Sequence, residues 1–329
     1  MRRACAPRCL PHRQAAHAGP RVGRDPAGES GRGRGRGRRR QVIPTSFDYV
    51  RAKNLKDALK AMGKSTKVIA GGHSLLPLLR FRLAQPETLV DIGQLRELKG
   101  IKRAGGGVKI GAATTYRELL ESRELGTLYP LIAEVTEHIG DLQVRNAGTI
   151  GGGLAHADPA ADMPPVMLVL DATFLLQSKG GKRSVAARKF FKGPFTTAMK
   201  PNELLTEIQL PAPAKGAGTG GAGGAYASFE QAASGYALVG AAALITVAKG
   251  MITRADLAFT GLADTPFLAP AAAKLVGTQG QAELIAEVAA ASVAGVEAND
   301  DIHASAAYRT HLGMVAARRA LAQALARAG

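Results

Sequence analysis

The sequence predicts a mixed α+β protein of about two domains, and three observations support this fold class. The chain has 329 residues, 46 % of them hydrophobic, which is enough for two domains of about 150 residues with cores of their own. Short strand-like and helix-like patterns alternate through the first two thirds of the chain. After a Pro- and Gly-rich segment, three strand-like runs are followed by two Ala-rich helical patterns, as is typical of an α+β unit.

The first unit of the folded body is expected at residues 43–100. Apolar residues at helical spacing predict a short helix over 54–62, with Asn54 as its N-cap. A strand, a short helix and a second buried strand complete the unit, at Thr66–Ala70, Leu75–Leu79 and Thr88–Ile92.

A second unit is expected at residues 101–215. It begins with a strand and two helices, at Val108–Gly111, Thr115–Glu121 and Leu131–Ile139. A glycine-rich loop is then expected over Gln143–Gly153. Further strands or buried segments are expected at Val166–Leu170, Ala172–Gln177 and Leu204–Leu210. A short helix is expected between the last two, at Ala186–Phe191.

A third unit is expected at residues 220–329. The segment before it, PAPAKGAGTGGAGG at 211–224, is expected to form a linker or an exposed hairpin loop. The unit itself begins with three strands, at Ala225–Glu230, Ala237–Val247 and Arg254–Leu262. Two helices follow, at 281–294 and 304–327.

The amino-terminal 42 residues differ in composition from the rest of the chain. Residues 1–40 hold twelve Arg and two acidic residues, and so carry ten of the seventeen net positive charges. Such a segment has little to bury and repels itself, so we expect a disordered extension. No aromatic residue is interleaved with the Arg, so we do not expect nucleic acid as a partner. Because a GUG start codon is read as Met, Val42 is the expected native start, with residues 1–41 lying upstream of it.

The positions of the cysteines limit the chemistry expected of the chain, and its hydropathy limits the expected location. Cys5 and Cys9 both lie in the extension, so the body has no thiolate for a disulfide, a zinc site or an iron–sulfur cluster. The longest nearly apolar run, Tyr236–Ala248, is shorter than the ~20 residues that a membrane span needs. We therefore expect a cytoplasmic protein without a membrane span.

Two short glycine-rich stretches are the most informative motifs. The first, Ala70-Gly71-Gly72-His73-Ser74, follows a predicted strand, and the second is Thr149-Ile150-Gly151-Gly152-Gly153. Adjacent glycines let backbone N–H groups approach a diphosphate without a Cβ in the way, and hydroxyl groups add hydrogen bonds. Two such stretches suit the two sides of a pyrophosphate. The alternative is that these glycines simply form tight turns.

Other sequence signals are weaker. Gly218, Gly220 and Gly223 fit the letters G-x-G-x-x-G, but no strand precedes them and no helix follows, so we do not interpret them as a phosphate site. Asp158 and Asp162 suit hydrogen-bond acceptors toward a polyol or ribityl chain better than metal ligands, with turn formation and helix capping as the alternative. The histidines show no metal-ligand spacing, so no metal site and no catalytic residue is expected in this chain.

Several segments together resemble the FAD-binding medium subunit of molybdenum hydroxylases, the carbon monoxide dehydrogenase and xanthine dehydrogenase family. The resemblance covers about residues 43–328, in the right order, and its most specific part is the pair of glycine stretches with the D-P-x-x-D-M-P run. The segments that carry it are IAGGHSLLPLLRFRLAQPETLVDI (69–92), IGAATTYREL (110–119), IGDLQVRNAGTIGGGLAHADPAADMPPVMLVLDA (139–172), FFKGPFTTAMKPNELLTEIQLP (190–211), SFEQAASGYALVGAAA (228–243) and YRTHLGMVAARRAL (308–321).

The resemblance implies an FAD-binding domain at 43–215 and a C-terminal α+β domain at 220–329. The first would have two subdomains, about 43–100 and 101–215, and the flavin fold of the vanillyl-alcohol oxidase type. The second would be a small antiparallel sheet with helices, and FAD would bind non-covalently between the two. By residue matching, the pyrophosphate would lie on Ala70, Gly71, Gly72, His73 and Ser74 and on Thr149, Ile150, Gly151, Gly152 and Gly153, with Asp162 near the ribityl and ring end and Leu205 and Tyr236 against the isoalloxazine ring.

The chain also departs from the family pattern at two positions. Gly153 stands where the family often has Asn, so one side-chain hydrogen bond is in doubt. Gln231 stands where some relatives have Lys near the flavin, which leaves the flavin potential open.

The resemblance further implies a division of labour among subunits. A large subunit would bind the molybdenum cofactor, a small subunit would carry [2Fe–2S] clusters, and this chain would pass electrons through FAD to an external acceptor. The expected assembly is a dimer of heterotrimers, with a loose membrane association through the acceptor as an alternative to a purely cytoplasmic location. A stand-alone FAD-dependent oxidoreductase of the same fold and a flavin-free assembly or binding protein remain alternatives.

Overall fold

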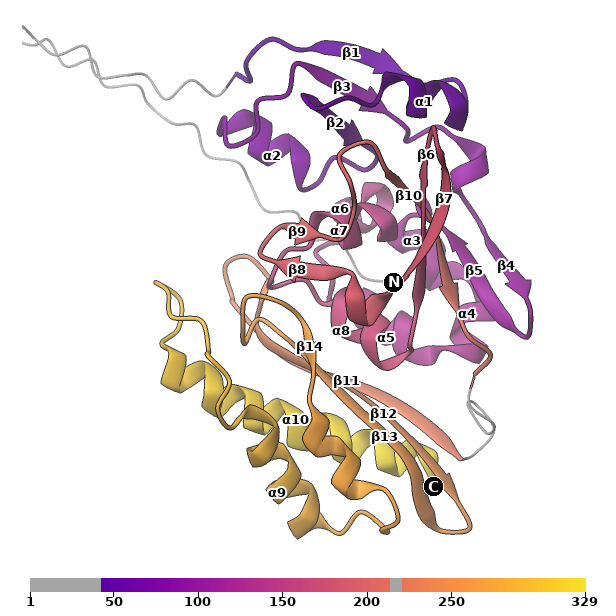
Figure 1. Ribbon diagram of the computed structural model, residues 1–329. Coiled ribbons are helices and arrows are strands. Elements are labelled where there is room, and N and C mark those ends of the chain that lie inside the picture. Colours follow the sequence, from indigo (N-terminus) through magenta and orange to yellow (C-terminus); the bar gives the residue numbers. More distant parts are fainter. Residues whose placement is uncertain (1–42, 214–220) are drawn as a thin grey trace, which may run out of the picture. The chain divides into compact units, whose positions relative to one another are not determined.

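The computed structural model describes residues 43–213 and 221–329, whose elements are labelled in Figure 1. The expectations for residues 1–42, and for Gly218 and Gly220, lie outside the described residues. The first element group is a three-stranded parallel sheet in the order β1-β3-β2, flanked by two short helices. Its elements are β1 (Asp48–Arg51), α1 (Leu55–Ala61), β2 (Thr66–Ile69), α2 (Leu75–Arg80) and β3 (Thr88–Asp91). Asn54 caps α1 as predicted, because its side chain accepts a hydrogen bond from the Asp57 N–H group.

The second element group is built on a five-stranded antiparallel sheet in the order β4-β5-β10-β6-β7. Its strands are β4 (Ile101–Ala104), β5 (Gly107–Gly111), β6 (Thr173–Ser178), β7 (Gly181–Ala186) and β10 (Leu204–Leu210). The strands β8 (Phe191–Gly193) and β9 (Thr196–Thr197) pair with each other in a separate two-stranded sheet. The long return from β5 to β6 holds six helices, which are α3 (Tyr116–Glu121), α4 (Arg123–Leu128), α5 (Pro130–His138), α6 (Leu142–Ala147), α7 (Ile150–His156) and α8 (Met163–Val169). This return contains the second glycine stretch and Asp162.

Two sequence expectations for this region are wrong, and a third is right only in part. The loop expected over Gln143–Gly153 is the pair α6 and α7, whose N-caps Asp141 and Thr149 satisfy their first turns. Val166–Leu170, expected as a strand or a buried segment, is buried but helical, because the prolines before it occupy the first turn of α8, where no N–H donor is needed. The helix expected over Ala186–Phe191 is a single 3₁₀ turn followed by β8.

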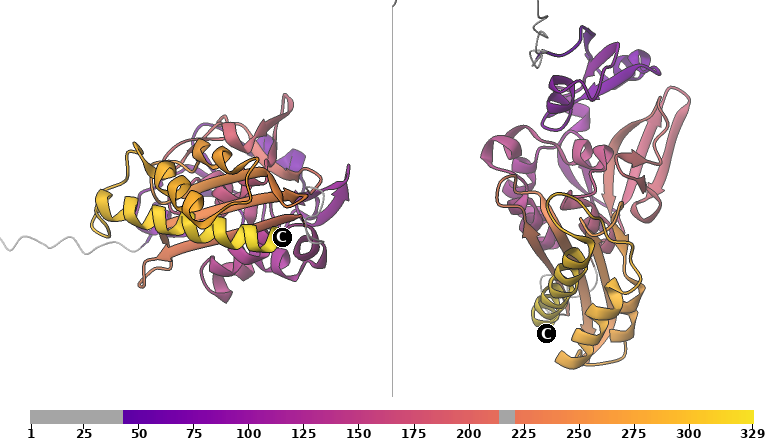
Figure 2. Two further views of the ribbon diagram at one scale, coloured as in Figure 1. Left: turned by 90° about the horizontal axis from the view of Figure 1, so that it is seen from below. Right: turned by 90° about the vertical axis from the view of Figure 1, so that its left-hand side faces the viewer.

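The C-terminal group is a four-stranded antiparallel sheet covered by helices. Its elements are β11 (Ala222–Glu230), β12 (Ala237–Ala248), β13 (Met251–Thr260), β14 (Phe267–Leu268), a 3₁₀ segment at Pro270–Leu275, α9 (Ala282–Val293) and α10 (Ala306–Ala328). Figure 2 shows α10 running along the strands. The three long strands and both helices confirm the sequence prediction, with boundaries shifted by a few residues.

The C-terminal sheet is buried on both faces, which explains its alanine content. Ala241 and Ala243 of β12 pack toward the α9 and α10 core, whereas Ala242 between them joins the core around α8. Small side chains on both faces let α10 and α8 approach the same strand closely. Among the described helices, none combines the length and the apolar character that crossing a membrane requires.

Candidate cofactor-binding site

The fold brings the first glycine-rich stretch into contact with the residues directly before the second one. A Cβ added to Gly71 would overlap the carbonyl oxygen of Ala147 and would lie 2.7 Å from Cα of Gly148. Gly71 therefore allows two backbone segments, distant in sequence, to touch. The prediction that both stretches contribute to one site has a geometric basis, although the roles of their residues toward a cofactor stay predictions.

The first stretch leaves its backbone donors free. Gly72 has φ +77°, a left-handed conformation that favours glycine, and its carbonyl accepts the N–H of Leu76 at 2.9 Å. The N–H groups of Gly72, His73 and Ser74 form no hydrogen bond with another described residue, and the Ser74 side chain does not cap α2. His73 is exposed, while Ala70, Gly71, Gly72 and Ser74 are half-buried. This stretch can therefore offer several donors to an anionic ligand.

The second stretch uses its donors internally. The Thr149 hydroxyl accepts the N–H of Gly152 at 3.2 Å, and the Thr149 carbonyl accepts the N–H of Gly153 at 3.0 Å. The N–H groups of Ile150 and Gly151 donate to Thr114 at 3.1 Å and to Ala112 at 2.9 Å. These amides are not free in this conformation, contrary to the sequence interpretation of adjacent glycines as open donors.

The glycines of the second stretch are instead needed for close packing. A Cβ on Gly151 would lie 2.8 Å from Cα of Ala112, so only glycine fits between the start of α7 and the end of β5. A Cβ on Gly153 would overlap the hydroxyl oxygen of Tyr116. The place of a side chain at position 153, where the family pattern often has Asn, is therefore taken by the tyrosine hydroxyl.

Asp162 lies buried at the start of α8, 7 % exposed, and is held by the C-terminal sheet. The Tyr226 hydroxyl of β11 donates a hydrogen bond of 2.6 Å to Oδ1 of Asp162. Burial raises the pKa of Asp162 to about 7, and the Tyr226 hydrogen bond opposes that rise. Since burial also raises the pKa of Tyr226, its hydroxyl stays protonated and acts as the donor.

The turn before Asp162 is fixed by the same sheet. The Thr260 hydroxyl donates to the carbonyl oxygens of Pro159 and Ala161, both at 2.8 Å, and the Gly261 N–H donates to Pro159 at 2.8 Å. Asp158 forms the turn itself, because its Oδ1 accepts the Ala160 N–H at 2.9 Å. Asp158 thus fits the turn-forming alternative, whereas the Asp162 carboxyl caps no helix and keeps one oxygen free of protein partners among the described residues.

The two residues expected against the isoalloxazine ring differ in exposure. Tyr236 is 49 % exposed, and burial, together with the charges of Asp158 and Asp162, raises its pKa. The turn that carries Tyr236 is tied by Gln231, whose amide nitrogen lies 2.8 Å from Nδ1 of His303. Leu205 of β10 is only 3 % exposed and belongs to the core. A ring-contacting role for Leu205 stays a prediction.

Two tyrosines in the site carried no sequence signal. Tyr116 and Tyr226 are 7 % and 4 % exposed, and both lie within the electrostatic field of Asp162. The capping box of Thr115 and Glu118 predicts where α3 begins and so places Tyr116 in its first turn. The capping box does not show what the Tyr116 hydroxyl contacts, and no sequence pattern shows what the Tyr226 hydroxyl contacts. Both contacts form between segments that are distant in sequence.

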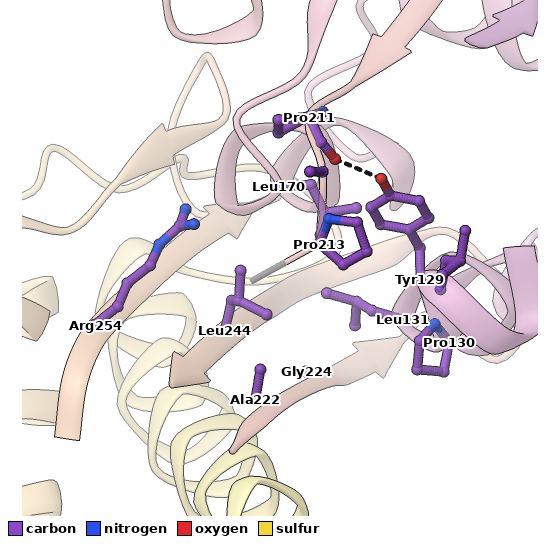
Figure 3. Close-up of a pocket in the computed structure, with 12 residues that line it drawn as sticks. Tyr129, Pro130, Leu131, Leu170, Pro211, Pro213, Ala222, Gly224, Leu244 and Arg254 are labelled. Atoms are coloured by element: carbon purple, nitrogen blue, oxygen red, sulfur yellow. Dashed lines mark hydrogen bonds between the residues drawn. The ribbon is translucent and has the colours of Figure 1, made fainter. Parts of the chain in front are cut away.

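Metal chemistry has no counterpart in the described chain. Within residues 43–213 and 221–329, no three His, Cys, Asp or Glu side chains gather as metal ligands would. One hollow, lined mostly by apolar residues, is separate from the glycine stretches. It lies between α5 and the C-terminal sheet, where the Tyr129 hydroxyl donates to the Pro211 carbonyl beside Leu131, Leu244 and Arg254 (Figure 3).

Two family models match this chain. The "FAD binding domain in molybdopterin dehydrogenase" matches residues 45–213, and the "CO dehydrogenase flavoprotein C-terminal domain" matches residues 224–324. The carbon monoxide dehydrogenase medium chain of Afipia carboxidovorans is 40 % identical over 291 residues, which is 87 % of this chain and 99 % of that chain. The glyceraldehyde dehydrogenase medium chain of Sulfolobus acidocaldarius is 38 % identical over 282 residues, 85 % of this chain and 98 % of the relative.

Solved structures agree with the sequence relatives. Carbon monoxide dehydrogenase from Hydrogenophaga pseudoflava superposes with a TM-score of 0.83 at 37 % identity, covering 87 % of this chain and 100 % of that chain. Quinoline 2-oxidoreductase from Pseudomonas putida 86 gives 0.81 at 32 % identity, covering 87 % and 99 %. These similarities confirm the predicted α+β flavin fold. The chain therefore belongs to the FAD-binding medium subunits of molybdenum hydroxylases, the family that includes the carbon monoxide dehydrogenase medium chain and the xanthine dehydrogenase FAD-binding subunit.

Proposed function

We propose that this chain binds FAD non-covalently and passes electrons from the [2Fe–2S] clusters of a partner subunit to an external acceptor. The observation that carries the proposal is the contact of Gly71 with Ala147 and Gly148, directly before the second glycine stretch, in a chain whose relatives match it over nearly their full length. Bound flavin supplies the redox chemistry, because it exchanges single electrons with clusters and electron pairs with acceptors. The chain's own residues bind, orient and tune it.

The residues present suit a flavin dinucleotide. Free N–H groups at Gly72, His73 and Ser74 match the diphosphate, since anions are commonly bound by successive backbone donors. Asp162, with one oxygen already satisfied by Tyr226, offers the other as an acceptor for a hydroxyl group. Tyr236 offers an aromatic side chain that is 49 % exposed, which suits contact with a planar ring.

The roles implied by the family resemblance complete the proposed site. Ala70–Ser74 and Thr149–Gly153 would hold the pyrophosphate, the second stretch chiefly through the Thr149 hydroxyl and its contact with the first. Leu205 would approach the ring, for which its side chain must be uncovered from its present 3 % exposure. No residue of this chain is assigned a catalytic role.

The partners follow from what this chain lacks. Its sequence has no cysteine after Cys9, so the clusters must be held by another subunit. The relatives are themselves named medium chains, which supports a large molybdopterin-binding subunit and a small cluster-bearing subunit. We propose a dimer of heterotrimers, located in the cytoplasm, with loose membrane association through the acceptor as the alternative.

The domain division is part of the proposal. We place an FAD-binding domain at 43–215, with subdomains at about 43–100 and 101–215, and a C-terminal flavoprotein domain at 220–329. Each part contains a separate sheet, which supports this division. Residues 1–42 are proposed to be an extension outside both domains.

Co-expression of the chain with the two partner subunits tests the proposal. Native mass spectrometry is expected to show a heterotrimer or its dimer, with flavin that acid denaturation releases completely. Flavin that stays attached after denaturation would contradict non-covalent binding. A chain that stays alone beside both partners and oxidises an organic substrate unaided would support the stand-alone oxidoreductase, and a colourless assembled chain would support the flavin-free alternative.

A further inference from the structure

We propose that the hydroxyl group of Tyr116 is a cofactor-binding group, directed at the ribityl chain of bound FAD. The proposal rests on the proposed function, because it names a further residue of the same site. It does not follow from the glycine motifs, and its basis is the position and the missing partner of one buried side chain.

The backbone and the ring of Tyr116 both contact the second glycine stretch or the residue directly before it. Its N–H donates to the Gly148 carbonyl at 3.0 Å, and its neighbour Thr115 forms an isolated bridge with Thr149. The ring covers Gly148, since a Cβ there would lie 3.1 Å from Cδ2 of the ring. The hydroxyl then reaches the α7 backbone at Gly153, where a side chain would otherwise stand.

The Tyr116 hydroxyl has no hydrogen-bond partner among the described residues, although the residue is only 7 % exposed. The hydroxyl groups of two other buried tyrosines do have partners. Tyr129 donates to the Pro211 carbonyl, and Tyr226 donates to Asp162. The Tyr116 hydroxyl oxygen is not among the fully enclosed side-chain atoms that lack a partner in the described residues, so it is accessible from outside the protein. A ring that is otherwise buried therefore holds an unpaired, accessible hydroxyl in a fixed position, where a ligand can complete its hydrogen bond.

The surroundings identify which part of the ligand this is. Tyr116 lies between the second glycine stretch and the acidic end of the site, because its hydroxyl touches Gly153 and the charges of Asp162 and Tyr236 act on it. In the proposed site the diphosphate lies on the glycine side and the ring lies beside Tyr236. The segment of FAD between diphosphate and ring is the ribityl chain, whose hydroxyl groups can both donate to and accept from a phenol.

The test compares two Tyr→Phe variants of the full chain with the wild type, in the complex with the partner subunits after the flavin has been removed. Tyr116→Phe keeps the ring and removes only the hydroxyl, so we expect FAD to bind about fivefold more weakly, as for one lost neutral hydrogen bond. FMN, which contains the ribityl chain, should weaken by the same factor as a competitor, and ADP, which lacks it, should be unaffected. Because no protein partner is left unpaired, the melting temperature of the flavin-free Tyr116→Phe chain should equal that of the wild type.

Tyr129→Phe is the matched control, since its hydroxyl donates to the Pro211 carbonyl (Figure 3), in a hollow whose lining includes no residue of the glycine stretches. It should lower the melting temperature and leave FAD affinity unchanged. If Tyr116→Phe binds FAD, FMN and ADP as the wild type does, the inference is wrong. Wild-type chain that binds no FAD would instead overturn the proposed function, so the two failures are distinct.

A second pair of variants tests the geometry independently of FAD. Gly153→Ala should lower the melting temperature of the wild-type chain, because the new Cβ overlaps the Tyr116 hydroxyl. In a Tyr116→Phe background the nearest ring atom, Cζ, would lie 3.6 Å from that Cβ, an ordinary contact. Gly153→Ala should therefore lower the melting temperature less in the Tyr116→Phe background than in the wild type. An equal decrease in both backgrounds would show that the Tyr116 hydroxyl does not lie where the new Cβ would stand.

Discussion

The stretch after β2 and the stretch that begins α7 share a double-glycine pattern, yet their backbone donors are used differently. At Gly72, His73 and Ser74 the N–H groups have no partner among the described residues, whereas those of Gly151, Gly152 and Gly153 are bonded within the chain. In the first stretch glycine permits a left-handed turn, and in the second it permits close packing. A shared glycine pattern therefore does not specify a shared physical role.

The largest expected effect is on the folding of the second stretch. Gly151→Val should lower the free energy of unfolding of the flavin-free chain by about 3 kcal/mol, because the side chain overlaps the Ala112 backbone. Chemical denaturation measures this value. Gly126→Val is the control, since a Cβ at Gly126 of α4 meets nothing within 4 Å. Equal stabilities of the two variants would break the comparison.

The next effect concerns Asp162, which accepts a hydrogen bond from Tyr226 of the C-terminal sheet. Its pKa in the folded chain is about 7, above the usual value of about 3.9 in an unfolded chain. The folded state therefore binds a proton that the unfolded state releases, and stability should fall as the pH rises from about 4 to about 7. Asp162→Asn should remove this part of the pH dependence. A wild-type stability that rises with pH across this window, together with an unchanged slope in the variant, would contradict the assignment.

The third effect separates strain from ligand binding in the first stretch. Gly72→Ala should lower the free energy of unfolding by about 1–2 kcal/mol because of its left-handed conformation, and should weaken FAD binding more than tenfold because the free donors move. Gly250→Ala has nearly the same φ, +75°, in the hairpin between β12 and β13, with open space around its Cβ. It should lose similar stability and keep FAD affinity, as calorimetry and flavin titration can show.

The smallest effect is the removal of a helix cap. Thr149→Ala should lower the free energy of unfolding by about 1 kcal/mol, because the Gly152 N–H loses its acceptor. Ser122→Ala removes the cap of α4, whose hydroxyl accepts the Leu125 N–H at 3.2 Å, and provides a control away from the site. Thr149→Ala alone should also weaken FAD binding slightly. A large loss of FAD affinity would mean that the second stretch contacts the ligand more directly than its internal bonds suggest.

Periodicity and turn chemistry predicted most of the elements, and the exceptions have physical reasons. The strands of the C-terminal sheet and the helix α10 stand out because their apolar repeats are long. The helix α7 was missed because its three glycines disfavour helix, and here its cap and tertiary packing outweigh propensity. The helix α6 contains no glycine itself, but it is short and Gly140 and Gly148 flank it. The two glycine stretches were found from the sequence, but Tyr116 and Tyr226 were not. Their contacts with Gly153 and Asp162 arise only when distant segments meet.

Amide hydrogen exchange by NMR, on the chain with and without saturating FAD, tests the central claim most directly. The account predicts that the N–H groups of Gly72, His73 and Ser74 exchange quickly without FAD and become strongly protected with it. The N–H groups of Gly151 and Gly153 should be slow in both states, because their acceptors lie within the chain. Unchanged exchange at Gly72, His73 and Ser74 on FAD binding, or new protection confined to the second stretch, would contradict the account.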